Sequence, residues 1–333
     1  MNTAAQRRRP AEQPEAPRVS RRRNAKPRRG TLPPKSKPGS AVLATLRVST
    51  YNIHKGVLRE FIGLRRVTRI HELRTRLHEL DSDLVFLQEV QGRHERHARR
   101  LEHWPDEPQD VFLSRSPRLR QTFETAYGRN ASYLHGHHGN ALLSRYPIVD
   151  LENRDISDHA LEKRGVLHCV VKVGRVDVHC FVVHFGLLAR SRERQLGALI
   201  EWVSNAVSGD APLIIAGDFN DWRNRLSDRL CREIGVVEVF DAVKPKLDFV
   251  RRAAYFARDR YPAIELPEAA AGAPRMVRTA RTFPALVPWF RMDRIYQRGF
   301  RVSAARVLRG IEWARLSDHS PLVADLELVD PGA

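Results

Sequence analysis

The chain has 333 residues, 42% of them hydrophobic, and a formal net charge of +18. That is enough apolar material for the core of one large domain or of two ordinary ones. No run approaches the roughly 18 apolar residues of a membrane span, which argues against a membrane-embedded protein, and we expect a soluble, cytoplasmic one. The three cysteines lack the Cys-x-x-Cys spacing of a zinc site or redox pair, and we expect reduced thiols at Cys169, Cys180 and Cys231.

The positive charge is concentrated in residues 1–40, which hold twelve Lys/Arg and two Glu and so contribute +10. This segment has few apolar residues to stabilise a fold, so we predict a disordered basic tail. It also lacks the apolar stretch of a secretory signal. Such a tail attracts nucleic acid or an anionic membrane surface, to which it could hold the protein peripherally; a merely solubilising tail is an equal alternative.

Residues 41–330 predict one mixed α/β domain. In chain order, a strand (43–54), an amphipathic helix (67–80) and two strands (83–90 and 139–148) come first. A predicted hairpin (166–173 and 176–185), a helix (196–207) and a buried strand (211–220) follow, and three further strands are indicated over 291–300, 301–308 and 320–328. Residues 244–277 show no clear period and indicate a loop or a small insertion. We expect two packed, mainly antiparallel β-sheets with helices outside.

Polar side chains stand at the ends of these strands. Four strands end in such a group and two begin with one; the residues are Asn52 with His54, Glu89, His184, Asp218 with Asn220, Asp293, and Asp318 with His319. Each alone is explained as a strand terminator. If the strands run antiparallel, however, the ends of one set and the starts of the other share an edge, and the polar groups meet there.

This inventory favours one chemistry. Carboxylates without nearby cysteine are hard oxygen ligands, which suit Mg²⁺, Mn²⁺ or Ca²⁺ better than zinc. Histidines move protons or bind phosphate oxygens, and asparagine donates hydrogen bonds to developing charge. A hard cation with these groups suits phosphoester hydrolysis, in which the metal neutralises phosphate charge while a base activates water.

The motifs that carry these residues occur in a fixed order: YNIH, DLVFLQEV, GNALLSRYPI, KRGV, VVHFG, GDFND, MDRIY and SDHSPL. In that order they resemble the endonuclease/exonuclease/phosphatase superfamily over most of residues 45–327, and in particular its bacterial soluble members rather than the apurinic-site nucleases. The resemblance implies a four-layered α/β sandwich, with the catalytic domain over 41–330 and Mg²⁺ or Mn²⁺ as cofactor.

The resemblance also implies roles for individual residues. Glu89 matches the principal metal ligand, with Asn52 and Asp318 close to the metal and its water shell. Asp218 matches the acid that orients or deprotonates the attacking water, and Asn220 the amide that stabilises the charge developing on phosphorus.

The histidines have implied roles as well. His319 matches the base, or a direct donor to the phosphate, and Asp293 the acid that holds its imidazole in one tautomer. His184 matches a second histidine, a candidate acid for the leaving group. Glu162 aligns more loosely as the orienting partner of His184.

Further residues have plainer alternatives. Asn140, Arg145 and Arg164 are candidates for contact with the substrate phosphate, although a turn explains Asn140 equally well. Trp222 and residues 281–284 either line the substrate cleft or pack. The histidine tract is interpreted as part of a loop because no Cys or acid completes a metal site there; it comprises His135, His137 and His138.

Two substrate classes remain open. The histidine of VVHFG stands where the apurinic-site branch carries a tyrosine, which favours a phosphodiesterase acting on a small or lipid-linked phosphodiester. The basic tail and the net +8 of the remaining chain favour instead an endo- or exonuclease on DNA or RNA. A binding scaffold without activity is disfavoured because every expected acid, histidine and amide is present. The sequence does not indicate an oligomeric state.

Overall fold

The computed structural model describes residues 41–59, 66–117, 122–159, 162–243 and 280–330. The predicted basic tail (1–40) and the predicted insertion (244–277) lie outside the described residues. Within them, no helix combines the length and the apolarity that crossing a bilayer requires.

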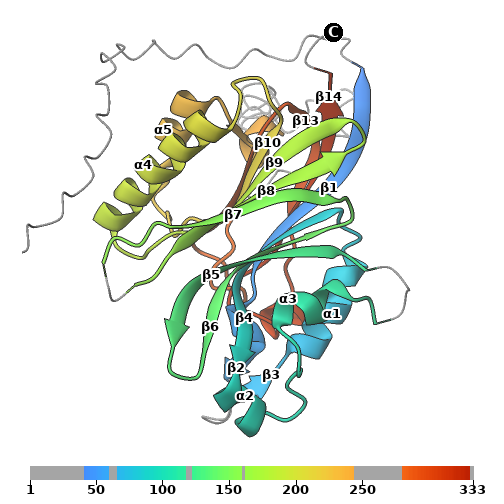
Figure 1. Ribbon diagram of the computed structural model, residues 1–333, viewed down its shortest axis with the longest axis vertical. Coiled ribbons are helices and arrows are strands. Elements are labelled where there is room, and N and C mark those ends of the chain that lie inside the picture. Colours follow the sequence, from blue (N-terminus) through green and yellow to red (C-terminus); the bar gives the residue numbers. More distant parts are fainter. Residues whose placement is uncertain (1–40, 60–65, 118–121, 160–161, 244–279, 331–333) are drawn as a thin grey trace, which may run out of the picture. The chain divides into compact units, whose positions relative to one another are not determined.

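Two six-stranded sheets make up the centre of the fold (Figure 1). Sheet 1 has the strand order β13-β14-β1-β4-β6-β5, with bounds Phe300–Val307, Leu322–Val329, Val42–Asn52, Leu84–His94, Gly136–Ser144 and Glu124–Tyr133. Sheet 2 has the order β11-β12-β10-β9-β8-β7, with bounds Val237–Glu238, Asp293–Arg298, Leu213–Asp218, Val176–His184, Gly165–Val173 and Ile148–Asp155. A separate short pair joins β2 (Val57–Arg59) to β3 (Arg66–Thr68).

Helices cover the outer face of each sheet, which gives the four layers that the resemblance implied. The described helices are η1 (His54–Gly56), α1 (Ile70–Glu79), α2 (Glu95–Arg100), α3 (Gln109–Ser114), α4 (Ala189–Ala206), α5 (Ser227–Ile234), α6 (Val239–Ala242) and α8 (Ile311–Ala314). Apolar residues of α1 and α3 pack on sheet 1. Those of α4 and α5 pack on sheet 2, and the remaining cluster fills the space between the sheets. Burial of these apolar surfaces drives the layers together.

The two sheets have the same pattern of strand directions. Each has one parallel pair in its middle, β1 with β4 and β9 with β10, and antiparallel pairs on either side. Each parallel pair is connected by a helix, α1 or α4, as a parallel connection requires. The carboxyl ends of both pairs therefore lie at one edge, together with the amino ends of their neighbours β14 and β12.

Three edge strands were missing from the sequence prediction, β5, β7 and the two-residue β11. β5 lies in the polar stretch after the strand at 83–90, and β7 follows the strand predicted at 139–148, which ends earlier than expected at Ser144. Edge strands expose much of their surface, so β7 is almost entirely exposed and its sequence, IVDLENRD, lacks the apolar run of a buried strand. The histidine tract was also assigned wrongly: His137 and His138 belong to β6.

The glycine of GDFND illustrates how closely the strands of sheet 2 approach. Gly217 has φ +150°, and a Cβ there would lie 1.9 Å from the Val183 carbonyl oxygen of β9. Only glycine fits this contact without a shift of the backbone. The neighbouring Asp218 is thereby held against the end of β9.

Candidate active site

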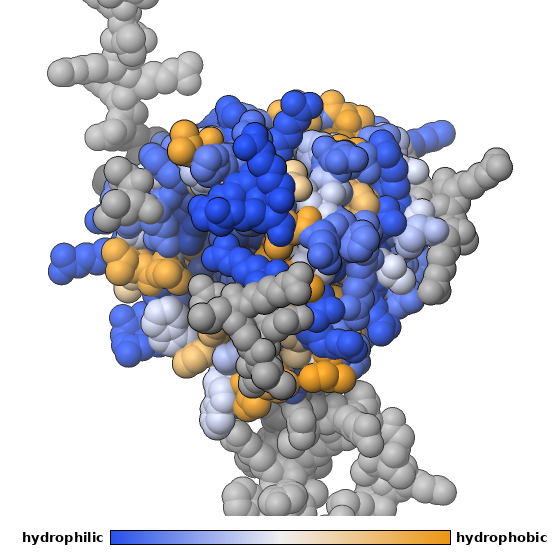
Figure 2. All heavy atoms as spheres, turned by 90° about the horizontal axis from the view of Figure 1, so that it is seen from below, coloured by the Kyte–Doolittle hydropathy of each residue, from blue (hydrophilic) through white to orange (hydrophobic). Residues whose placement is uncertain are grey.

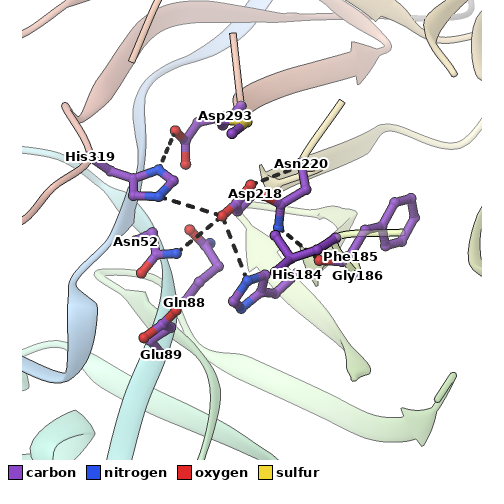
Figure 3. A network of polar contacts seen from close by, with 12 residues as sticks. Asn52, Gln88, Glu89, His184, Phe185, Gly186, Asp218, Asn220, Asp293 and His319 are labelled. Atoms are coloured by element: carbon purple, nitrogen blue, oxygen red, sulfur yellow. Dashed lines mark hydrogen bonds and ion pairs between the residues drawn. The ribbon is translucent and has the colours of Figure 1, made fainter. Parts of the chain in front are cut away.

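The polar residues at the strand ends meet at the shared edge, as the strand directions require (Figure 3). β1 and β4 bring Asn52 and Glu89 from sheet 1, and β9 and β10 bring His184 and Asp218 from sheet 2. Figure 2 views the molecule from the end at which α2 lies in Figure 1, and the surface there is mainly hydrophilic with separate apolar patches. Ligands of open α/β sheets bind outside the carboxyl ends of parallel strands, which is where these residues lie.

Asp218 is the centre of the network. Its Oδ2 accepts a hydrogen bond from Asn52 Nδ2 (3.1 Å), which links sheet 1 to sheet 2, and its Oδ1 accepts one from the Asn220 backbone amide (2.9 Å). The Nε2 atoms of His184 and His319 lie 3.6 and 3.8 Å from the same Oδ2. Burial raises the pKa of Asp218 to about 6, and the nearby charge of Asp293 adds to the rise.

His319 is fixed from its other ring nitrogen. Nδ1 lies 2.8 Å from Asp293 Oδ2, so the Asp293–His319 pair predicted from the sequence is formed. This bond leaves Nε2 directed toward Asp218, with both side chains almost fully buried. Burial alone would lower the pKa of His319, but attraction to Asp293, Asp218 and Asp318 outweighs it and raises the pKa to about 10.

His184 has the opposite electrostatic environment. Burial lowers its pKa well below the ordinary value, and the positive charge of Arg164 lowers it further. The ring is therefore a neutral donor or acceptor. Asn220, in the left-handed region at φ +50°, donates its side-chain amide to the Phe185 carbonyl (2.9 Å) and so ties the GDFND turn to the end of β9.

Glu89 stands outside this network, on the sheet 1 side (Figure 3). Its backbone has φ +58°, an unusual conformation for a non-glycine residue, at an irregularity in the pairing of β4 with β6. Burial alone would raise the pKa of Glu89, but nearby Lys55, His54 and His138 lower it. Lys55 Nζ lies 3.4 Å from its Oε2.

Asp318 lies beside this group and is also ionised. Its Oδ1 is 3.2 Å from His54 Nδ1. Burial alone would raise the pKa of Asp318, but the hydrogen bond from His54 and the charge of His319 lower it. Asn52 completes this side, since its Oδ1 accepts the His54 backbone amide (3.1 Å). The Ser317 hydroxyl donates to the Asn52 carbonyl (2.6 Å) and holds the SDH turn against β1.

Two sets of acidic side chains at this edge could each hold a divalent cation. Asp218, Asp293 and His319 bring one potential ligand atom each within 4.8 Å of the others. In that group, however, His319 Nδ1 and Asp293 Oδ2 are already bonded to each other, and both Asp218 oxygens accept hydrogen bonds.

The Glu89 side fits a hard cation better. Glu89 Oε2 is buried without a hydrogen-bond partner, and its nearest charged contact is a cation, Lys55. Asp318 is close enough for its negative charge to act on Glu89. Two acids and an amide oxygen are the donor set that Mg²⁺ or Mn²⁺ prefers.

The structure changes the assignment of Glu162. In the described part of the chain its carboxylate is paired not with His184 but with Arg164, which donates from Nη2 (2.8 Å), and with the Leu187 backbone amide (3.2 Å). Arg164 also donates from Nε to the Phe185 carbonyl (3.2 Å). Arg164 thus contacts the residue that follows His184, while Glu162 positions Arg164 and the chain after β9.

Asn140 and Arg145 do not lie where a substrate contact needs them. The Asn140 side chain is fully buried and donates to the Gly165 and Val182 carbonyls (2.9 and 3.1 Å), bridging β6 to sheet 2. Arg145 follows the end of β6 that pairs with the start of β4, opposite to Glu89, and binds Asp81 (2.6 Å). The sequence does not reveal this register, because the motif GNALLSR does not indicate which end of the strand faces the site.

Sequence reasoning missed two titratable neighbours of Glu89. Lys55 and His138 gave no signal on their own: Lys55 stands three residues after β1, and His138 lies in the histidine tract assigned to a loop. Burial lowers the pKa of His138 to about 4, with Lys55 contributing to the fall. Both lie close to Glu89 only because β1, β4 and β6 are adjacent.

Comparison with known proteins agrees with this geometry. Residues 49–319 match the model of the "Endonuclease/Exonuclease/phosphatase family". The chain belongs to this family. Uncharacterized protein YbhP of Escherichia coli K12 is 39% identical over 287 residues, which are 85% of this chain and 97% of that protein.

Solved structures of the endonuclease/exonuclease/phosphatase family share the fold. A Beutenbergia cavernae member has a TM-score of 0.57 at 19% identity, covering 86% of this chain and 72% of its own. The mannosyl-6-phosphatase Bt3783 of Bacteroides thetaiotaomicron (0.55, 15%) covers 84% and 99%. D. rerio TDP2 complexed with single-strand DNA product (0.54, 16%) covers 85% and 99%. The activities in the family's name all hydrolyse phosphoester bonds.

Proposed function

We propose that the chain is a metal-dependent phosphodiesterase that acts on a small or lipid-linked phosphodiester. The observation that carries the proposal is the convergence of two imidazole Nε2 atoms on one carboxylate oxygen, Asp218 Oδ2, at 3.6 and 3.8 Å. A phosphodiester has two non-bridging oxygens, and two imidazoles facing one position can each donate to one of them. The acid between them is placed to take a proton from the attacking water.

Each residue then has a defined task. Asp218 orients and deprotonates the water that attacks phosphorus in line with the leaving oxygen. His319 is held by Asp293 so that its Nε2 proton points at a phosphate oxygen, and His184 donates from the other side. The side-chain amide of Asn220 lies at the same strand end and stabilises the developing negative charge.

The metal ion, Mg²⁺ or Mn²⁺, would be held by Glu89 with Asn52 and Asp318. When bound, it supplies positive charge that neutralises the phosphate and stabilises the leaving oxygen. Lys55 and His54 lower the pKa of Glu89, and His54 lowers that of Asp318, so both carboxylates stay ionised.

A panel of substrates tests the proposal. Full-length protein, with and without Mg²⁺ or Mn²⁺, is offered a chromogenic phosphodiester, phospholipid vesicles, plasmid DNA and RNA. We expect metal-dependent turnover of the chromogenic diester, reduced about 100-fold or more in His319→Ala. The control, His71→Ala on the exposed side of α1, should change the rate less than two-fold. Lack of turnover on every substrate, or full activity of His319→Ala, would contradict the proposal.

A nuclease is the second candidate, and one observation favours it. Arg96, Arg99 and Arg100 of α2 line a cavity of about 330 Å³ with Glu95 and His135. This arginine cluster follows β4, on the side of the sheet toward which the site edge faces, and suits a phosphate backbone. If the panel shows cleavage of DNA or RNA alone, the nuclease replaces the phosphodiesterase.

A further inference from the structure

An exposed apolar surface borders the candidate active site. Its members are large hydrophobic side chains with exposed fractions between 39% and 65%: Leu187, Leu188, Trp222, Leu286, Val287, Trp289 and Phe290. We name this surface, Leu187–Leu188 with Trp222 and residues 286–290, the apolar rim. Large apolar side chains are costly to expose together, and such a surface indicates an interaction site.

Contacts link the three segments of the apolar rim, although they are far apart in the sequence. Arg192 joins the first two: its Nη1 donates to the Leu187 carbonyl (2.5 Å), and its guanidinium carbon lies 4.9 Å from the centre of the Trp222 ring. The Trp222 ring in turn lies 6.4 Å, edge to face, from that of Phe290. The third segment continues from Phe290 through Trp289 and Val287.

Each segment is connected directly to a residue of the site. Leu187 comes three residues after His184, and Trp222 two residues after Asn220. Phe283 pairs with Phe290 across the third segment and places its ring 5.1 Å from that of His319. Ala285 donates its amide to the Asp318 carbonyl (2.7 Å). A partner that covers the apolar rim is therefore held next to the phosphate-binding position.

The composition of the apolar rim favours hydrocarbon over nucleobases. Single-stranded nucleic acid stacks on aromatic rings, and four of the seven side chains are aliphatic, with no π face to offer. Aliphatic side chains mixed with tryptophan are typical of surfaces that lie in the boundary between headgroups and acyl chains.

The charge around the apolar rim favours an anionic surface. Arg190, Arg223 and Arg225 are exposed beside Leu188 and Trp222. Two acids of the same region form ion pairs in the part of the chain that the structure describes: Glu193 is paired with Arg229, and Asp158 with Arg194. Arginines near a membrane surface add electrostatic attraction to anionic lipid headgroups.

We propose that the apolar rim docks the protein onto an anionic phospholipid bilayer and thereby presents a headgroup phosphodiester to the site. The part of this proposal that concerns the substrate rests on the proposed phosphodiesterase; the docking does not. Residues of the apolar rim enter the headgroup boundary while the arginines stay in contact with phosphates. The lipid then reaches Asp218 without leaving the bilayer.

A double variant separates docking from catalysis. Val287→Ser with Trp289→Ser removes two members of the apolar rim that are 55% and 65% exposed. Val149→Ser with Leu151→Ser is the matched control, since these residues are 57% and 53% exposed on β7. Binding of the full chain is measured by co-sedimentation with phosphatidylcholine vesicles with and without phosphatidylglycerol, at 0.15 and 0.5 M salt, and with a single-stranded oligonucleotide. Turnover of a chromogenic phosphodiester is measured alongside.

We expect wild type and control to bind phosphatidylglycerol vesicles equally, and the Val287/Trp289 variant to bind at least ten-fold more weakly at both salt concentrations. Its chromogenic turnover should stay within two-fold of wild type. The proposal is overturned if the variant binds vesicles like wild type, if the control loses binding equally, or if the variant loses oligonucleotide binding but not vesicle binding. If the wild type binds vesicles through the apolar rim but hydrolyses no phosphodiester, the docking stands and the proposed function fails.

Discussion

Sheets 1 and 2 have the same pattern of strand directions at the site, but the acidic side chains that they contribute differ in burial and in their neighbours. In each sheet, a parallel pair of strands ends at the edge. The acids of sheet 2 are buried, since the Asp218 and Asp293 side chains are 2% and 1% exposed. On sheet 1, Asp318 is 37% exposed and Glu89 18%, and cations stand beside both. The same topology thus yields a dry, hydrogen-bonded half and a wetter, ionic half.

This difference suits the two tasks that phosphoester hydrolysis requires. A buried acid held by hydrogen bonds keeps one position and has a raised pKa, which suits proton transfer. Partly exposed acids can exchange a hydrated ion with solvent, and nearby cations keep them ionised until it binds. We expect substitutions in the sheet 2 half to lower the rate itself and those in the sheet 1 half to change the metal requirement.

The largest effect should follow Asp218→Asn. The amide keeps the size of the side chain but cannot take a proton, so kcat should fall about 10³-fold at every metal concentration. Steady-state kinetics with the chromogenic diester across a Mg²⁺ titration would measure this. Asp106→Asn, on an exposed loop, serves as the control and should leave kcat unchanged. A variant that recovers near wild-type kcat at high Mg²⁺ would show that Asp218 holds the metal instead.

Glu89→Gln should behave in the opposite way. Removing one charge from the proposed ligand weakens the cation site, so the Mg²⁺ concentration for half-maximal activity should rise at least ten-fold. At saturating metal, kcat should return to within about ten-fold of wild type. Isothermal titration with Mn²⁺, without substrate, gives an independent measurement of the affinity. Unchanged Mn²⁺ affinity in Glu89→Gln would move the metal to the Asp218–Asp293–His319 group.

Asn140→Ala distinguishes a bridge between the sheets from a substrate contact. The variant loses two buried hydrogen bonds, to the Gly165 and Val182 carbonyls, so the free energy of unfolding should fall by about 2–4 kcal/mol. kcat/KM of the folded protein should stay within a few-fold of wild type. Urea unfolding measures the first and kinetics at low temperature the second. Asn153→Ala, a half-buried asparagine of β7, should cost less than about 1 kcal/mol. A stable Asn140→Ala with raised KM would restore the substrate role.

Asn140 also shows where sequence reasoning reached its limit. The motifs identified the fold family and the strand ends, and therefore the meeting of Asp218, Asp293 and His319, because alternation and termination are local signals. Asn140 lies in the equally recognisable GNALLSR, but its side chain points between the sheets, and Arg145 lies at the wrong end of β6. Which end of a strand faces a site depends on pairing between distant segments, which no local pattern carries.

The same reason explains the residues that were missed or misassigned. Glu162 stands near His184 in the fold, yet its carboxylate is used by Arg164 and the Leu187 amide, a competition that only the three-dimensional arrangement reveals. Lys55 and His138 reach Glu89 from β1's end and from β6. Residues that act on a site from neighbouring strands have no fixed spacing from the site residues in the sequence, so no motif identifies them.

The smallest predicted effect lies on the outer face of sheet 2, away from the site. His168 packs on Phe181 (4.2 Å between ring centres) beneath Trp202 of α4, and burial lowers its pKa from 6.5 to about 4, with His179 adding to the fall. Between these values the unfolded chain binds a proton that the folded protein does not, so this contribution to stability is complete above pH 6.5 and is lost as pH falls toward 4.

His168→Gln removes this titration. Urea unfolding between pH 7.5 and 4.5 should therefore show wild type losing more stability than the variant, by on the order of 1–2 kcal/mol after solvent screening. His78 of α1, on the outer face of sheet 1, tilts against Phe123 and has its pKa lowered by burial in the same direction but less deeply. His78→Gln should give a smaller difference of the same sign. Parallel pH profiles for wild type and His168→Gln would mean that His168 takes up its proton in the folded protein, and that the layer between sheet 2 and α4 admits water as readily as the site edge of sheet 1 does.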